Sequence, residues 1–446
     1  MISSRKTSFA DFLAYLPLLA LAIDLFTPFL IWRGLLPAAV RWVSHFAIAL
    51  MILLTILRML VFNHIPRSFW LIISVSILWF YVALANGQGL PSTIWGVWLL
   101  FQFPFVGLFM YLQPVRAEQL PGILRRLGFL VLCLQVAAQL LQYALGATPG
   151  DSLSGLFGRN GTGNAVLFDI LICCLYFGYW ITTQRWQGLI AAIILSAISS
   201  TLGEMKLFPI AITIIGFLAI IFFARKHSVP VKMLVYLIFL FLVVSGFFGL
   251  YNLIVPGAAE SPLQTYLTSP DTLLAYLFRV ETFYSQGNTY TDIGRGAAVE
   301  IGWNSIQRDP LTFFLGYGIG TRSESQSLGT SGIALNSSSF GPSVGTSLLV
   351  MLQEMGLLGM LLLVGLYFWV LATLRRDILK DPFSEALELR FALILFSALW
   401  PLFIWYANVW IMRVPMLLYW LALGFVLAEA NIPLMKTSKK KALSTL

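Results

Sequence analysis

Four arginines and no lysine fall in one long polar stretch of the sequence, residues 253–345. They are Arg279, Arg295, Arg308 and Arg322. A guanidinium group can hold a phosphate through two parallel hydrogen bonds, so this stretch is suited to an anion. Arg295 falls in the first turn of a helix predicted over 293–308, where free N–H groups and the helix dipole also favour negative charge. Spacing alone favours the alternative, a surface ion pair with Asp292 or Glu300.

A second pair of charges stands in the turn Gly203-Glu204-Met205-Lys206, between two apolar segments. Charges at membrane depth are costly and usually face the interior of a helix bundle or a water-filled cavity. Lys206 could hold a phosphate, and Glu204 could act as a base or orient a hydroxyl group. An interfacial ion pair that closes a short helical hairpin accounts for the same residues equally well.

A glycine-rich loop over Gly155–Asn164 could bring its backbone close to a ligand. Arg159 is the only charge in this loop, and Asp169 follows just inside the next apolar segment. The simpler interpretation is a turn in which Asn164 caps a helix. Glu354, in an apolar segment further along, is a functional candidate by default, but pairing inside the bundle explains it equally well.

The composition places these charges in a membrane protein. Hydrophobic residues make up 59% of the 446 residues and charged residues 11%, with a mean hydropathy of +0.85. Soluble domains carry about 25% charged residues, so a soluble protein is excluded. The net charge of +9 falls in short loops, where it indicates membrane orientation and not nucleic-acid binding. The three cysteines lie in apolar stretches and predict neither a disulfide framework nor a metal site.

A helix needs about 20 apolar residues to cross a membrane. The sequence therefore predicts an all-α, polytopic transmembrane bundle of about twelve spans, with one large periplasmic loop between spans 9 and 10. The predicted spans are 12–32, 42–62, 69–86, 92–112, 123–146, 164–183, 188–203, 207–224, 231–252, 346–374, 389–407 and 411–429. We expect the first apolar run to be a span itself and not a cleavable signal peptide. The predicted regions are spans 1–9 (1–252), the loop (253–345), spans 10–12 (346–430) and a basic cytoplasmic tail (431–446).

Lysine and arginine in the short loops set the orientation. Most of them fall on the side of the two termini, which predicts both termini in the cytoplasm of a bacterial inner membrane. Arg33 and Arg41 are the local exceptions.

The large loop has local signals of its own. Ser269-Pro270-Asp271 predicts a helix start before an apolar stretch over 272–284. Val299, Trp303 and Ile306 share one face of the helix over 293–308, so we expect that face to be buried. A flexible turn, Gly316-Tyr317-Gly318-Ile319-Gly320, and a mobile polar segment over 321–345 follow.

Several motifs, in this order and within this topology, resemble those of the O-antigen polymerase and O-antigen ligase superfamily of bacterial polysaccharide assembly. They are Gly294-Arg295, Trp303, Asp309-Pro310, Leu315–Gly320 and Leu352–Gly359. The segments Phe157–Asn164 and Gly203–Lys206 also stand where the family has its other polar outer segments.

The resemblance implies a metal-independent glycosyltransferase, without a cofactor, that uses a sugar chain on undecaprenyl pyrophosphate as donor. Periplasmic cations would steady the leaving pyrophosphate, a role that Arg295 and Lys206, with Arg159, could take. Glu204 is the first choice as base for the acceptor hydroxyl, and Glu354 the second. The predicted catalytic residues are Arg295, Glu204 and Lys206, and the predicted substrate-binding residues are Arg159, Asn164, Trp303, Arg322 and Glu354.

One departure favours a polymerase over a ligase. The ligase branch has a histidine late in the large loop, where this chain has Ala334-Leu335-Asn336-Ser337-Ser338-Ser339-Phe340. We therefore expect polymerisation of lipid-linked repeat units into O-antigen, capsule or exopolysaccharide. The expected partners are the lipid-linked glycan and the bilayer, with a chain-length regulator as a further candidate.

Three alternatives stay open. A ligase would transfer the glycan to lipid A core or protein. A lipid-linked sugar transporter should have matched halves and broken helices, which the sequence does not predict. A membrane scaffold would tolerate replacement of the loop arginines.

Overall fold

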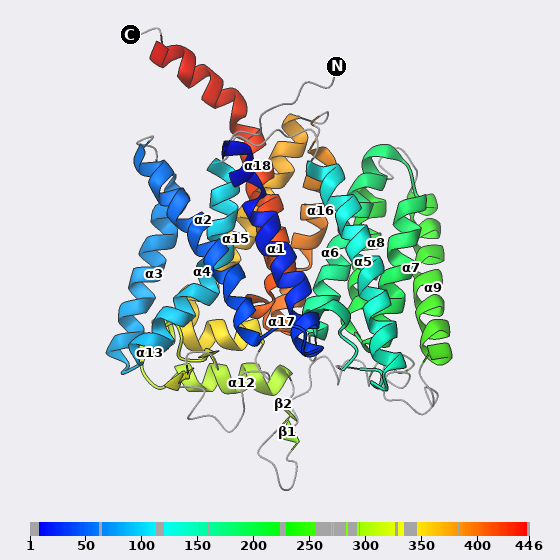
Figure 1. Ribbon diagram of the computed structural model, residues 1–446, viewed down its shortest axis with the longest axis horizontal. Helices are drawn as coiled ribbons and strands as arrows, with labels where there is room; N and C mark the ends of the chain where they lie inside the picture. The colour runs from blue at the N-terminus through cyan, green and yellow to red at the C-terminus, as the bar shows by residue number, and fades with distance from the viewer. Residues whose placement is uncertain are drawn as a thin grey trace.

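Long apolar helices make up nearly all of the chain that the computed structural model describes (Figure 1). The described residues are 9–61, 65–112, 120–150, 152–158, 161–223, 229–254, 269, 271, 282–283, 292–293, 295–325, 329–333, 346–381, 384 and 386–443. The all-α class predicted from the apolar runs is therefore confirmed.

The first two thirds of the bundle are helices α1 (Phe9–Trp32), α2 (Arg41–Val61), α3 (Arg67–Ala85), α4 (Leu90–Leu112), α5 (Leu120–Ala144), α6 (Thr162–Thr183), α7 (Gln187–Leu202), α8 (Leu207–Phe223) and α9 (Val229–Ile254). The last third is α15 (Ser347–Lys380), α16 (Leu387–Ala398), α17 (Trp400–Tyr406) and α18 (Arg413–Leu443). Between α9 and α15 come α12 (Arg295–Ile306) and α13 (Pro310–Leu315). Short 3-10 turns are η1 (Ala38–Val40), η2 (Gly155–Phe157) and η6 (Val409–Ile411).

The helices indicate a membrane protein by length and composition. Seven of them are long and apolar enough to cross a membrane, or eight if the bent pair α16 and α17 forms one span. Helices lie at all twelve predicted ranges, but α1, α7, α8 and α18 are not among those that are long and apolar enough over their described residues. The total of twelve crossings therefore stays a prediction.

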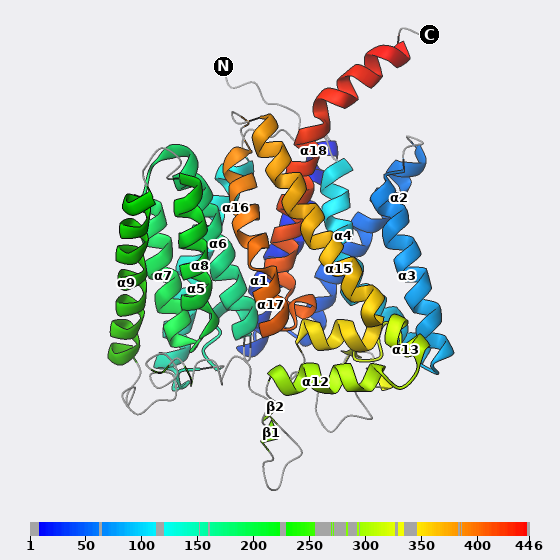
Figure 2. The same cartoon turned by 180° about the vertical axis from the view of Figure 1, so that it is seen from behind.

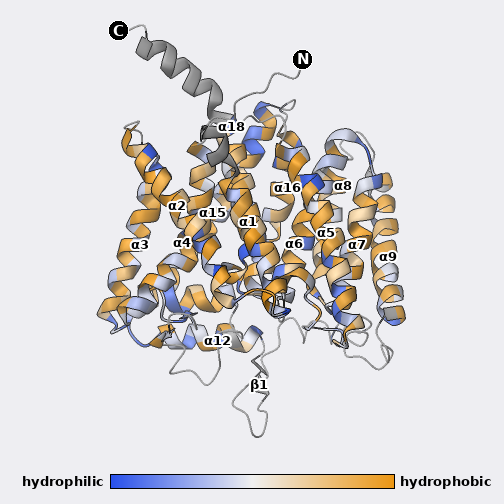
Figure 3. Cartoon of the chain, in the orientation of Figure 1, coloured by the Kyte–Doolittle hydropathy of each residue, from blue (hydrophilic) through white to orange (hydrophobic). Residues whose placement is uncertain are grey.

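Close helix contacts at glycines hold the centre of the bundle together. A Cβ on Gly424 of α18 would overlap the backbone of Gly107 on α4, and one on Gly178 of α6 would overlap the carbonyl of Glu388 on α16. Small residues let helix backbones approach closely where lipid supplies no hydrophobic drive to associate. Apolar residues dominate the length of these helices (Figure 3).

The two ends of the bundle differ. The start of α1 and the end of α18 lie at one end, whereas α12 and α13 lie across the other end (Figure 1). The predicted loop therefore stands opposite the described chain ends, and which end faces the periplasm stays a prediction.

Local structure in the loop corrects part of the prediction. Asp292–Ile293 forms strand β2, paired antiparallel with β1 (Thr282–Phe283), so the second helix begins at Arg295 and ends at Ile306. Strands β3 (Glu324–Ser325) and β4 (Thr330–Ser331) form a hairpin inside the segment predicted to be mobile. Residues 272–281 and 334–345 lie outside the described residues.

Helix α15 has two parts. Gly356 has non-helical backbone angles (φ 60°, ψ −159°), and the helix bends there. The part before the bend runs across the bundle beside α12, and the longer part then runs along the bundle (Figure 2). The bend thus places the residues before Gly356 at the same end of the molecule as the loop.

Candidate functional site

A glycine-rich strap, residues 316–320, docks onto the bend of α15. The N–H of Tyr317 donates to the carbonyl of Gln353 (2.7 Å) and the N–H of Gly318 donates to that of Glu354 (2.9 Å). A helix that bends at a glycine leaves carbonyl groups without their usual N–H donors. The strap supplies N–H donors to these carbonyl groups. The predicted turn is therefore a packed structural element.

The strap also lies against α3 and α4 with no space to spare. The indole Nε1 of Trp79 on α3 donates to the carbonyl of Leu315 (2.8 Å). A Cβ on Gly318 would overlap the backbone of Ala83, and one on Gly320 would overlap the carbonyl of Ser92. Gly318 and Gly320 have positive φ, 96° and 88°, which side chains disfavour. Glycine is thus required at both positions.

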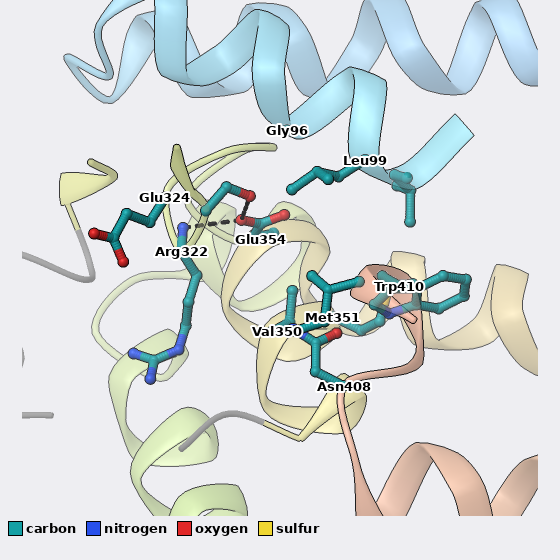
Figure 4. Close-up of a pocket in the computed structure, with 12 residues that line it drawn as sticks. Gly96, Leu99, Arg322, Glu324, Val350, Met351, Glu354, Asn408 and Trp410 are labelled. Atoms are coloured by element: carbon teal, nitrogen blue, oxygen red, sulfur yellow. Dashed lines mark hydrogen bonds between the residues drawn. The ribbon is translucent and has the colours of Figure 1, made fainter. Parts of the chain in front are cut away.

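Beyond the strap, Arg322 and Glu354 meet at a cavity of about 230 Å³. A carboxylate oxygen of Glu354 accepts from the N–H of Arg322 (2.9 Å) and from the hydroxyl of Ser323 (3.4 Å). Both charged residues are buried, with 4% and 5% exposure. The guanidinium group points away from the carboxylate (Figure 4). The cavity therefore has separate basic and acidic groups.

The electrostatics of Arg322 suit an anionic ligand. Burial lowers the pKa of its guanidinium group to about 10, and the charge of Glu354 opposes that shift. Arg322 therefore stays positively charged at neutral pH. A cation in a water-poor site interacts with a bound anion more strongly than one in open solvent.

The rest of the cavity wall comes from α4, the start of α15 and the segment after α17. Apolar lining comes from Leu99, Leu100, Val350 and Met351. Asn408 and Trp410 add buried polar atoms, Oδ1 and Nε1, that have no hydrogen-bond partner among the described residues. An acceptor and a donor left over in a cavity are suited to the hydroxyl groups of a ligand. The sequence analysis missed both residues.

Arg295 borders the same segment from outside the cavity lining. It is the first residue of α12, and its Nε donates to the carbonyl of Tyr406 (3.1 Å). Its guanidinium carbon also lies 3.9 Å from the centroid of the Tyr406 ring, in a cation–π contact. Tyr406 is two residues before Asn408 of the cavity wall. The contact with Tyr406 therefore places Arg295 near that wall.

The predicted pair Glu204 and Lys206 belongs to the α7–α8 turn and is not part of the cavity lining. Glu204 has positive φ (49°), and its carboxylate accepts from the hydroxyl of Tyr251 on α9 (3.2 Å). Lys206 follows in the same turn and is half-buried. The structure therefore brings Arg322 together with Glu354, and Glu204 together with α9.

Three other predicted residues have different outcomes. Arg159 lies outside the described residues. Asn164 lies in the first turn of α6, whose N-cap is Gly161, so the prediction that Asn164 caps this helix is wrong. Trp303 is 39% exposed and packs edge-on against Phe313, so the predicted buried face is wrong for Trp303, although Ile306 of the same face is fully buried.

An ion pair with several additional hydrogen bonds follows the cavity lining in the sequence. Arg413, two residues after Ile411 of the lining, contacts Asp24 on α1 (3.0 Å), and its guanidinium also donates to Gln102 on α4 (3.1 Å). Ser44 and His45 of α2 complete its shell. These bonds join α1, α2, α4 and α18, so Asp24 is paired inside the bundle.

The described residues hold no group of three or more His, Cys, Asp or Glu side chains placed to bind a metal ion. In comparisons with known proteins, no family model matches this chain and no curated protein matches its sequence.

Proposed function

We propose that this protein is a membrane glycosyltransferase that joins lipid-linked oligosaccharide units. The observation that supports the proposal is the meeting of Arg322 and Glu354 at one cavity. A buried cation suits a diphosphate leaving group, and a nearby carboxylate suits an acceptor hydroxyl. The motifs that resemble the polymerase and ligase superfamily include the strap and the start of α15 that build this cavity.

In the proposed reaction, the acceptor hydroxyl oxygen bonds to the anomeric carbon of the donor sugar. The bond between that carbon and the diphosphate oxygen breaks, and the polyprenyl diphosphate leaves with the electron pair. Arg322 stabilises the charge that develops on the diphosphate. Glu354 accepts the proton of the acceptor hydroxyl. Glu354 thereby takes the role that the sequence analysis gave first to Glu204.

Two cavity residues are suited to hold the sugar. Trp410 offers an indole N–H, and Asn408 offers an amide oxygen; neither atom has a partner within the described parts of the chain. Arg295, beside Tyr406, supplies a second cation near this wall. The proposed site thus combines anion-binding, proton-accepting and hydroxyl-binding groups.

Within this class we propose a polymerase of surface polysaccharide in a bacterial inner membrane, with the cavity on the periplasmic side and both termini in the cytoplasm. The donor would be a glycan on undecaprenyl pyrophosphate. A ligase that transfers to lipid A core or protein uses the same chemistry with another acceptor.

The test compares glycan lengths on gels from a deletion strain that carries wild type, Glu354→Gln or Glu324→Gln at matched membrane abundance. Glu324 also lines the cavity but is exposed, so it is the matched control. We expect long chains from wild type and from Glu324→Gln, and single lipid-linked units from Glu354→Gln. Normal long chains from Glu354→Gln would refute the assignment of this cavity as the catalytic site.

A further inference from the structure

Asp169 is a fully buried acid that the proposed reaction does not use. It lies on α6 with no solvent exposure. It follows the helix start at Thr162 by seven residues, which at about 1.5 Å per residue places it roughly 10 Å inside the bundle. Neither of its carboxylate oxygens has a hydrogen-bond partner among the residues that the structure describes.

Two helices that contact α6 carry further buried oxygen atoms in this part of the bundle. The hydroxyl of Ser199 on α7 lies beside the Asp169 carboxyl group. The geometry of this pair falls short of a full hydrogen bond, and the hydroxyl has no other partner in the described chain. The side-chain nitrogen of Gln139 on α5 donates to the carbonyls of Ser199 (3.0 Å) and Leu153 (2.8 Å). That arrangement leaves the Gln139 Oε1 buried and likewise unpartnered within the described residues. Each of the three helices therefore has a buried side-chain oxygen without a partner among the described residues, and the Ser199 hydroxyl can donate as well as accept.

The loop above this cluster is held rigidly in place. Gln135 and Gln142, one turn before and one turn after Gln139 on α5, bind the backbone of Ser154, Gly155 and Leu156. All three glutamines are fully buried. The cluster is thus a built feature of the fold, closed by the loop between α5 and α6.

A buried carboxyl group without a partner is stable either as the neutral acid or as a carboxylate beside a compensating cation. The free-energy cost of burying such a charge is large unless it is paired or binds an ion. A single carboxylate among neutral oxygens balances a charge of +1, whereas Ca²⁺ sites usually use several carboxylates. Oxygen ligands also favour hard cations over soft ones.

We propose that Asp169, Ser199 and Gln139 form a binding site for a monovalent alkali cation. The cation joins α5, α6 and α7 and rests beneath the loop that contains Leu153. The site is separate from the Arg322–Glu354 cavity and does not depend on the reaction proposed there.

The test measures the melting temperature of the purified full-length protein in NaCl, KCl and choline chloride at equal ionic strength. A ligand that binds only the folded state stabilises it in proportion to the logarithm of its concentration. We expect the melting temperature of wild type to rise by about 3–6 °C in an alkali salt at roughly 100 times its Kd, relative to choline. Asp169→Asn should lose that rise.

Asp377→Asn is the matched control. Asp377 is also a buried acid in a helix, but Nε of Arg376 binds it (3.3 Å) at a separate site. We expect this variant to keep the alkali response of wild type. Equal wild-type melting temperatures in the three salts, or an alkali response that survives in Asp169→Asn, would overturn the proposal. A wild type that responds to pH but not to alkali ions would overturn it too, because the carboxyl group would then simply be protonated.

Ser199→Ala keeps the test decisive if Asp169→Asn does not fold. It retains the carboxylate and removes one neutral ligand, which should raise the half-maximal cation concentration roughly three- to tenfold. Binding of radioactive sodium by wild type should saturate near one ion per protein. Unchanged sodium affinity in Ser199→Ala, or no bound sodium in wild type, counts against the site.

Discussion

Gly318 is the strap residue at which a single added methyl group should do the most damage. Its φ of 96° costs a side chain about 1–2 kcal/mol. The Cβ of Gly318→Ala would also overlap the backbone of Ala83, which cannot rotate away. Overpacking of this kind costs about 1–3 kcal/mol. The two effects together predict roughly 2–5 kcal/mol of destabilisation, or a strap that leaves α3.

The assay pairs thermal unfolding of the purified protein with glycan lengths in a deletion strain. Gly249→Ala on α9 is the control, because a Cβ there meets no atom within 4 Å. We expect Gly318→Ala to lower the melting temperature by about 5 °C or more and to shorten the glycan, because the strap also positions Arg322. If Gly318→Ala matches Gly249→Ala in both measurements, the conclusion that the strap packs tightly against α3 is wrong.

Three further predictions concern the cavity and its surroundings. Arg295→Ala should shorten the glycan at normal protein abundance, whereas Arg308→Ala should not; equal profiles for the two variants would remove Arg295 from the site. Trp410→Phe loses one donor, so the KM for the acceptor should rise about two- to tenfold with little change in melting temperature, and an unchanged KM would mean that the indole binds no substrate. Hydrogen bonds from Thr312 lower the pKa of Asp309, so this cap stabilises α13 above about pH 4 and is lost as the pH falls through the lowered pKa. Melting curves from pH 5 to 3 should therefore show a smaller acid effect in Asp309→Asn, and identical acid profiles would contradict the assignment.

The helices were predictable because each apolar run is long and bounded by polar residues or glycine. The same reasoning did not predict β2, and it placed the start of α12 at residue 293, two residues too early. Thr291-Asp292 is a good helix start by local chemistry, but β1 pairs with Asp292 and delays the helix to Arg295. Helical spacing alone also placed Trp303 on a buried face, whereas the face that packs is the one where Gly302 meets Leu349 of α15.

The candidate site was predictable only in part. Both residues were named from the sequence, Arg322 as one of the four arginines in the large loop and Glu354 as a charge in an apolar segment. Their meeting depends on the strap and on the bend at Gly356, which are contacts between distant parts of the chain. The polar composition of 321–345 predicted a mobile segment that includes Arg322. The sequence does not reveal that the carboxylate of Glu354 binds the backbone N–H of Arg322. Asn408 and Trp410 gave no signal, since a short polar interruption between two spans resembles an ordinary turn.

The cavity is assembled from segments that are synthesised far apart in time. Its wall on α4 is made early, Arg322 much later, the floor around Glu354 after that, and Trp410 close to the end. Chains emerge and fold from the N-terminus, so a nascent chain that already contains the strap still lacks the floor onto which the strap docks. Under the proposed function, catalytic competence therefore comes only after most of the chain has been synthesised, and a chain truncated before α15 should be inactive however well its earlier helices fold.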